Sequence, residues 1–244
     1  MTAPGCIDPA HCPVPDPSSK DLRRLRILRV EAGATFHTAF PRSRWPALFN
    51  DTLRGNARFS PLQVEGAVVP TMYGAATQTV ALLETAFHDV HESGTRIVSE
   101  SLQLARRGLA TLTTPVDLPF VDLTNSGLKR LGLRRDELVA TTPEHYACTR
   151  EWATVLHGRR IGPVTPAGIM WQSRVAELAG ADSPLLADLL PLADRVWVLF
   201  GDRVPMDPGA WRPGPPLHQD LVAGPGRLLA ERIAEQIGAV IVPN

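Results

Sequence analysis

The sequence predicts an α+β protein with one main domain, because short β-type runs and amphipathic helical patterns both occur along its 244 residues. The clearest β-type run covers residues 195–200, which are apolar enough for a buried strand. The clearest helical pattern covers residues 80–90, where apolar residues recur at three- and four-residue spacing. The apolar content of 44% is ordinary for a globular protein.

The first twenty residues predict a tail without regular structure. They carry five prolines, which remove backbone donors, and they lack an apolar pattern. They also lack the apolar core of a secretory signal. We therefore expect residues 1–20 to be a mobile, Pro-rich, disordered tail.

The first half of the main domain, expected over residues 24–204, contains three predicted strands and one helix. The strands cover residues 25–30, with Arg29 near the end, then 57–60 and 68–73. Residues 35–50 are expected to be a loop whose aromatic side chains pack over the sheet. A turn at Gly74 leads into the helix, and Gly94 is placed to end it in a left-handed C-cap.

The second half of the main domain also contains both predicted strands and predicted helices. Short β-type pieces are expected at residues 96–102, 109–113, 120–123, 168–172 and 195–200, with a helical turn at 128–133. A helix begins at Thr142-Pro143 and runs to about His157, because a cap residue followed by proline favours a helix start. Residues 205–244 form a Pro/Gly linker and an amphipathic final helix. Its stripe of Leu229, Ile233 and Ile237 either folds back on the domain or pairs with another subunit in a homodimer.

Charge and hydropathy exclude several classes of protein. The formal net charge is zero, so the bulk charge favours neither direct nucleic-acid binding nor an anionic membrane surface. No stretch approaches the roughly 18 consecutive apolar residues of a membrane span. We therefore expect a cytoplasmic protein without membrane contact.

The three cysteines predict neither a disulfide framework nor a metal site. An odd number of cysteines in a chain of this length suits a reducing cytosol. The spacing of Cys6, His11 and Cys12 matches no standard zinc pair, and no second Cys/His pair is evident. Walker A and dinucleotide-fingerprint sequences are also absent.

Glu84 is the strongest candidate functional residue. It lies on the helix face that carries the apolar residues, where a carboxylate is costly unless it has a partner. Arg58 and Tyr73, on strands upstream, are candidates to meet it. Such a cluster can bind an anionic ligand and stabilise positive charge in a transition state. The plainer alternative is a solvated helix residue.

Short motifs resemble those of the RES domain family, which is named for its Arg, Glu and Ser. Arg-Phe-Ser-Pro begins at Arg58, Met-Tyr-Gly-Ala contains Tyr73, and Ala-Leu-Leu-Glu ends at Glu84. Leu-Arg-Val around Arg29 precedes them, and Trp-Gln-Ser-Arg around Ser173 follows them. The resemblance covers roughly residues 24 to 204, and its specificity lies in the order and spacing of these short motifs.

The resemblance implies a fold like that of the ADP-ribosyltransferase toxins, with central β-sheets flanked by helices. Characterised members consume NAD, and many are toxins paired with a small DNA-binding, Xre-like antitoxin. It implies catalytic roles for Glu84 and Arg58, and contacts to NAD from Arg29, Arg58, Tyr73 and Ser173. NAD is then a substrate, and no separate cofactor is expected.

The chemistry of the nicotinamide–ribose bond fits these assignments, since a fixed carboxylate near the ribose and cations near the pyrophosphate stabilise the transition state. The acceptor stays open between inorganic phosphate, water and a protein side chain. A non-catalytic nucleotide-binding module is the alternative from another class.

Overall fold

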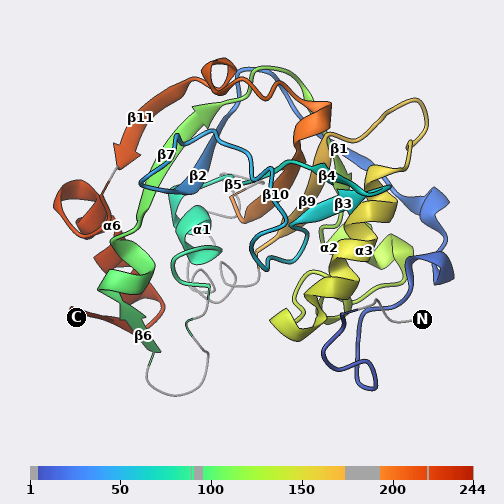
Figure 1. Cartoon of the computed structure of the whole chain (residues 1–244), viewed down its shortest axis with the longest axis horizontal. Helices are drawn as coiled ribbons and strands as arrows, with labels where there is room; N and C mark the ends of the chain where they lie inside the picture. The colour runs from blue at the N-terminus through green and yellow to red at the C-terminus, as the bar shows by residue number, and fades with distance from the viewer. Residues whose placement is uncertain (1–4, 89, 91–95, 174–192, 219, 244) are drawn as a thin grey trace.

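The computed structural model describes residues 5–88, 90, 96–173, 193–218 and 220–243 (Figure 1). Its main feature is a mixed sheet of eight strands. In spatial order these are β1 (Ile27–Val30), β8 (Leu118–Asp122), β9 (Gly168–Gln172), β10 (Arg195–Phe200), β5 (Thr71–Ala75), β2 (Thr35–Pro41), β7 (Arg107–Thr113) and β11 (Pro213–His218). Only β8 and β9 pair in parallel within this described sheet.

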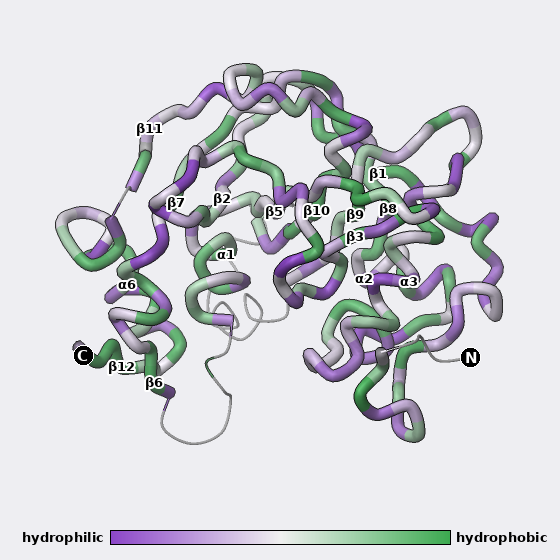
Figure 2. Tube along the Cα trace, in the orientation of Figure 1, coloured by the Kyte–Doolittle hydropathy of each residue, from purple (hydrophilic) through white to green (hydrophobic). Residues whose placement is uncertain are grey.

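Two smaller sheets and four α-helices complete the architecture among the described residues. β3 (Leu62–Val64) pairs with β4 (Ala67–Val69), and β6 (Arg96–Ser99) pairs in parallel with β12 (Ala239–Val242). In Figure 2, β6 and β12 lie side by side near the C-terminus, and β12 is the more hydrophobic of the two. The helices are α1 (Gln78–Leu83), α2 (Asn125–Leu131), α3 (Tyr146–His157) and α6 (Gly224–Gln236).

The two faces of the large sheet have different cover. All four helices contribute to one apolar cluster, together with sheet residues such as Ile169 and Val198. The opposite face packs in a second cluster, where Trp211 and Phe49 come from loops. This arrangement, with helices on one face of a largely antiparallel sheet, confirms the predicted α+β class.

The buried strand predicted at residues 195–200 is confirmed as β10, which lies between β9 and β5. Val198 enters the cluster on the helix side, and Trp197 enters the other cluster. A strand buried on both faces has no polar alternation, which explains its apolar run. Its register pairs Val198 with both Tyr73 and Ile169, and so aligns the strands that carry the candidate site.

The loop predicted over residues 35–50 is wrong in its first part, which forms the interior strand β2. Phe36, Thr38 and Phe40 are buried, and the residues between them are more exposed. This is the two-residue period of a strand. The rest of the segment does pack its aromatic Phe49 against the sheet, in the cluster that contains Phe36.

The strand predicted at residues 57–60 is also wrong. Ala57 and Ser60 form only an isolated bridge with mutual backbone hydrogen bonds, so the segment is a tight turn. Gly74, predicted as a turn, lies within β5 instead. A Cβ at Gly74 would approach Trp197 Nε1 to 2.5 Å and Phe36 Cδ2 to 2.7 Å, so this glycine permits close packing.

The helix predicted to continue toward Gly94 is shorter than expected. α1 ends at Leu83 with Glu84 as its C-cap, and Thr85 Oγ1 donates to Ala81 O at 2.6 Å as the chain turns away. Gly94 lies outside the described residues. The predicted apolar face is nevertheless present, because Val80, Leu83 and Phe87 are buried.

The N-terminal segment differs from the mobile tail expected for residues 1–20. Its described part, residues 5–20, lies against α3, where Trp152 Nε1 donates to Pro15 O at 2.8 Å. Val14 and Pro17 are buried, and Ile7 N donates to Glu144 O at 3.2 Å. Proline rules out regular strands and helices here, but it leaves carbonyl acceptors and apolar rings that a neighbouring helix can bind.

The C-terminal region is not a separate linker and helix, since β11 extends the main sheet beyond the predicted boundary at residue 204. The final helix is confirmed as α6, and it folds back on the domain. Ile233 and Ile237 are buried, and α6 contacts α1. Within the described residues, no helix has the length and apolar character needed to cross a membrane.

Candidate functional site

The candidate site lies on the helix side of the sheet, around adjacent strands β9, β10 and β5. Tyr73 is on β5, Glu84 caps the C-terminus of α1, and Ser173 directly follows β9. Arg58 lies in the turn before β3. The fold therefore brings together four residues that are separated by up to 115 positions in the chain, since 173 − 58 = 115.

The closest contact in the site joins Ser173 to Glu84. Ser173 Oγ donates a hydrogen bond to Glu84 Oε1 over 2.6 Å, and Ser173 is fully buried. The serine backbone is fixed in turn, because its N–H donates to Asp194 O at 2.9 Å next to the β9–β10 pairing. A hydrogen bond to a carboxylate at this distance is strong, and it fixes the orientation of the carboxylate.

Tyr73 forms one wall of the site. Its hydroxyl accepts a hydrogen bond from Phe59 N at 3.0 Å, and its ring packs edge-on against Trp171 at a centroid distance of 6.0 Å. Burial raises the pKa of the Tyr73 phenol, and the charges of Arg58 and Glu84 act on it in opposite directions. The phenol therefore stays neutral at physiological pH.

Arg58 is a buried cation with neutral partners. Its side chain donates from Nη2 to Thr141 O at 3.0 Å, and its Cζ lies 5.2 Å from the centroid of the Tyr146 ring. Arg58 Nε has no hydrogen-bond partner, and no ion pair with a carboxylate is present, among the residues that the structure describes. A buried charge in this state favours an anion as its partner.

Arg29 is not brought into this cluster. It is exposed on the edge strand β1, and β8, β9 and β10 separate it from β5. Four strand spacings amount to about 19 Å. Its register with Pro119 nevertheless places it on the same face of the sheet as Tyr73.

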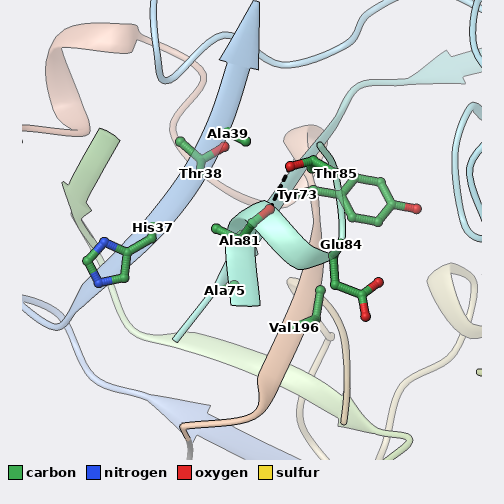
Figure 3. A pocket seen from close by; sticks show the side chains of 10 residues that line it. His37, Thr38, Ala39, Tyr73, Ala75, Ala81, Glu84, Thr85 and Val196 are labelled. Atoms are coloured by element: carbon green, nitrogen blue, oxygen red, sulfur yellow. Dashed lines mark hydrogen bonds between the residues drawn. The ribbon is translucent and has the colours of Figure 1, made fainter. Parts of the chain in front are cut away.

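A small pocket adjoins Tyr73 and Glu84 (Figure 3). Figure 3 shows the Glu84 carboxylate and the Tyr73 hydroxyl on the same side, with His37 directed away from both. Burial lowers the pKa of His37, so the imidazole is neutral near pH 7. The lining residues are His37, Thr38, Ala39, Tyr73, Gly74, Ala75, Ala81, Glu84, Thr85 and Val196.

Three residues contact Arg58, and the sequence did not predict these contacts. Tyr146 lies under the guanidinium, Thr141 accepts from it, and Thr149 Oγ1 donates to the Arg58 carbonyl oxygen. The first turn of α3 supplies Tyr146 and Thr149, three residues apart and so on one side of the helix. That spacing is visible in the sequence, but nothing there indicates that Arg58 is the partner.

The comparisons with known proteins agree on the fold. A family model described as the RES domain matches residues 25–183 of the chain. A chain of the solved structure titled "Crystal structure of the M.tuberculosis MbcT-MbcA toxin-antitoxin complex" aligns with a TM-score of 0.52 and 18% sequence identity. The alignment covers 84% of this chain and 92% of that chain. No curated protein sequence matches.

Proposed function

Because the chain belongs to the RES domain family, we propose that it is an enzyme that degrades NAD by cleaving the bond between nicotinamide and ribose. The observation that carries the proposal is the Ser173–Glu84 hydrogen bond, which orients the Glu84 carboxylate. The charges of Glu84 and of Arg58, a buried cation without an anionic partner among the described residues, both act on the Tyr73 phenol. An oxocarbenium-like ribose and a pyrophosphate would complete this pair of charges.

The proposed reaction breaks the bond between the nicotinamide nitrogen and the anomeric carbon of the ribose. The electron pair of that bond stays on the nitrogen, so nicotinamide leaves as a neutral ring, and positive charge builds up on the ribose. Glu84 stabilises this charge through its carboxylate. An oxygen of phosphate or water then bonds to the anomeric carbon and releases one proton to solvent, which gives ADP-ribose 1″-phosphate or ADP-ribose.

The other residues of the site bind and orient in this proposal. Ser173 holds the Glu84 carboxylate, and Tyr73 flanks the nicotinamide end. Arg58 contacts the pyrophosphate through the donors that Thr141 does not use. Arg29, on the same face but four strands away, would contact a part of the dinucleotide remote from the nicotinamide ribose.

We also propose that the protein is the toxin of a toxin–antitoxin pair, acting on cytoplasmic NAD and neutralised by an Xre-like antitoxin. Membership of the family and the fold shared with a chain of the MbcT-MbcA toxin-antitoxin complex support this role. ADP-ribosyl transfer to a protein is the second candidate activity, since the same bond is broken and only the acceptor differs.

The experiment is incubation of the purified protein with NAD, in buffers with and without inorganic phosphate, followed by chromatography of the products. Release of nicotinamide with ADP-ribose 1″-phosphate, only when phosphate is present, identifies phosphate as the acceptor. ADP-ribose in both buffers identifies water, and label transferred from NAD to added protein identifies a transferase. Binding without loss of NAD supports a non-catalytic nucleotide-binding module and contradicts the proposal.

A further inference from the structure

Two cysteines of the N-terminal segment meet one histidine at the N-terminus of α3, and the third cysteine, Cys148, adjoins this group through Cys12. The ligand atoms of Cys6, Cys12 and His145 all lie within 4.8 Å of one another. Cys6 Sγ is 3.6 Å from His145 Nδ1, and Cys12 Sγ is 3.5 Å from Cys148 Sγ. The cluster is at least half-shielded from solvent, because His145 and Cys148 are buried and the other two are intermediate.

Two of these separations, Cys6–His145 at 3.6 Å and Cys12–Cys148 at 3.5 Å, are close to the edges of a tetrahedral zinc site. With Zn–S bonds of about 2.3 Å and Zn–N bonds of about 2.0 Å, neighbouring ligand atoms lie about 3.5–3.8 Å apart. A disulfide needs a sulfur–sulfur distance of about 2.05 Å. The 3.5 Å between Cys12 Sγ and Cys148 Sγ therefore fits two ligands of one metal better than a covalent pair.

The ligands come in two pairs from two distant parts of the chain. Cys6 and Cys12 belong to the N-terminal segment, whereas His145 and Cys148 are three residues apart at the start of α3 and lie on one side of the helix. Two ligand pairs on separate elements are typical of structural zinc sites. The second pair is hard to recognise in the sequence, because a single His-x-x-Cys indicates no metal site by itself. Only the fold places it next to Cys6 and Cys12.

We propose that the protein binds one structural Zn²⁺ through Cys6, Cys12, Cys148 and His145. Three thiolates and an imidazole form a closed set of soft ligands that suits zinc and leaves no open coordination position for catalysis. The metal fastens the N-terminal segment to α3. One of its ligands, His145, directly precedes Tyr146, whose ring contacts the Arg58 guanidinium. This site replaces the sequence expectation that Cys6, His11 and Cys12 hold no metal, with His145 and Cys148 taking the place of His11.

The test is the metal content of untagged protein, produced with zinc in the medium and dialysed against metal-free buffer. We expect about one zinc per chain by elemental mass spectrometry. Replacement by Co²⁺ should give the charge-transfer and ligand-field absorption bands of a tetrahedral thiolate site. Cys12→Ser should reduce zinc affinity at least tenfold, whereas His11→Asn, an exposed control in the same segment, should keep the full zinc content. Zinc removal should also make the N-terminal segment cleavable by protease.

Three results would overturn the proposal. The first is wild-type protein that neither retains zinc nor gives the cobalt bands. The second is a Cys12→Ser variant that still holds zinc with wild-type affinity. The third is a Cys12–Cys148 disulfide, found by non-reducing mass spectrometry in protein prepared under reducing conditions. Should Cys12→Ser fail to fold, the zinc content and cobalt spectrum of the wild type decide the question without it.

Discussion

Ser173 acts through Glu84 in this account, since its hydroxyl donates to Glu84 Oε1 over 2.6 Å. Loss of the hydroxyl leaves the carboxylate charged but free to turn away from the ribose. Ser173 is therefore a positioning residue, and its contribution is the energy of one hydrogen bond to a charged group, about 1.5–3 kcal/mol.

We predict that Ser173→Ala lowers the turnover of NAD by about tenfold or more and leaves the circular dichroism spectrum unchanged. Ser43→Ala, at an exposed position in a loop, is the control. Within a Glu84→Gln background the same change should cost little more, because the two residues share one interaction. Equal losses in both backgrounds would show that Ser173 acts independently of Glu84.

The residues of the site could be named from the sequence more readily than their contacts. Glu84 was expected to meet Arg58, yet its hydrogen-bond partner is Ser173, and Arg58 rests on Thr141 and Tyr146. Periodicity places Glu84 on a helix face, but it carries no information about a strand end 89 residues away. Contacts of this kind depend on the sheet order, which local patterns do not specify.

Gly74 lets β5 pack tightly against the aromatic residues beneath the sheet. A methyl group there would lie 2.5 Å from Trp197 Nε1 and 2.7 Å from Phe36 Cδ2. Both rings belong to the buried cluster on the face opposite the helices, so neither has room to move freely.

We predict that Gly74→Ala destabilises the protein by about 1–3 kcal/mol, which is the usual cost of overpacking a core. Gly214→Ala in β11 is the matched control, because nothing lies within 4 Å of its added methyl group. Thermal denaturation followed by circular dichroism compares the two variants. Equal melting temperatures for both would contradict the packing role of Gly74.

α6 is held by its apolar stripe, in which Ile233 is buried against the main core. Ile233→Asp should lower the free energy of unfolding by at least about 3 kcal/mol, because it buries an unpaired charge. Leu228→Asp on the same helix is the control, since Leu228 is 63% exposed. Urea denaturation measures both. A stable Ile233→Asp variant would mean that α6 is not docked in solution.

The elements with the strongest patterns were predicted best. The apolar run of β10 and the Thr-Pro start before α3 each combine a period with a clear boundary signal. β2 was missed although Phe36, Thr38 and Phe40 alternate correctly, because its aromatic residues suggested a loop packed over the sheet. Alternation was the better guide, since it reports which side chains share a face.

The N-terminal segment joins the rest of the molecule through α3, and its removal should therefore lower stability. In zinc-free protein, where the proposed metal makes no contribution, deletion of residues 1–20 removes the burial of Val14, worth about 1.5–3 kcal/mol, and leaves Trp152 Nε1 without its acceptor Pro15 O. At about 2–4 °C per kcal/mol, we predict a melting temperature lower by roughly 5–10 °C.

The control for this deletion is Ile7→Ser, because Ile7 is 74% exposed and its side chain has little packing to lose. Differential scanning calorimetry measures the melting temperatures of the two variants. A docked segment lowers the melting temperature when it is deleted, whereas Ile7→Ser leaves it nearly unchanged. An unchanged melting temperature after deletion would restore the sequence-based expectation of a mobile tail. Composition alone suggested that tail, since proline content reports which elements are excluded but not which surfaces lie nearby.

The central claim is that the Glu84 carboxylate stabilises the ribose cation while NAD loses nicotinamide. Glu84→Gln keeps the size of the side chain and its capacity to accept from Ser173, but removes the charge. The matched control is Glu235→Gln on the exposed side of α6. Circular dichroism confirms that both variants fold before any rate is compared.

The most direct measurement is the rate of NAD loss under saturating NAD, together with the affinity for NAD, in the wild type and Glu84→Gln. We predict that turnover falls by about 100-fold or more, while affinity changes much less, because the ribose carries its positive charge only near the transition state. A folded Glu84→Gln protein that consumes NAD at the wild-type rate would contradict the assignment of Glu84. A wild type that neither binds nor consumes NAD would contradict the proposed activity as a whole.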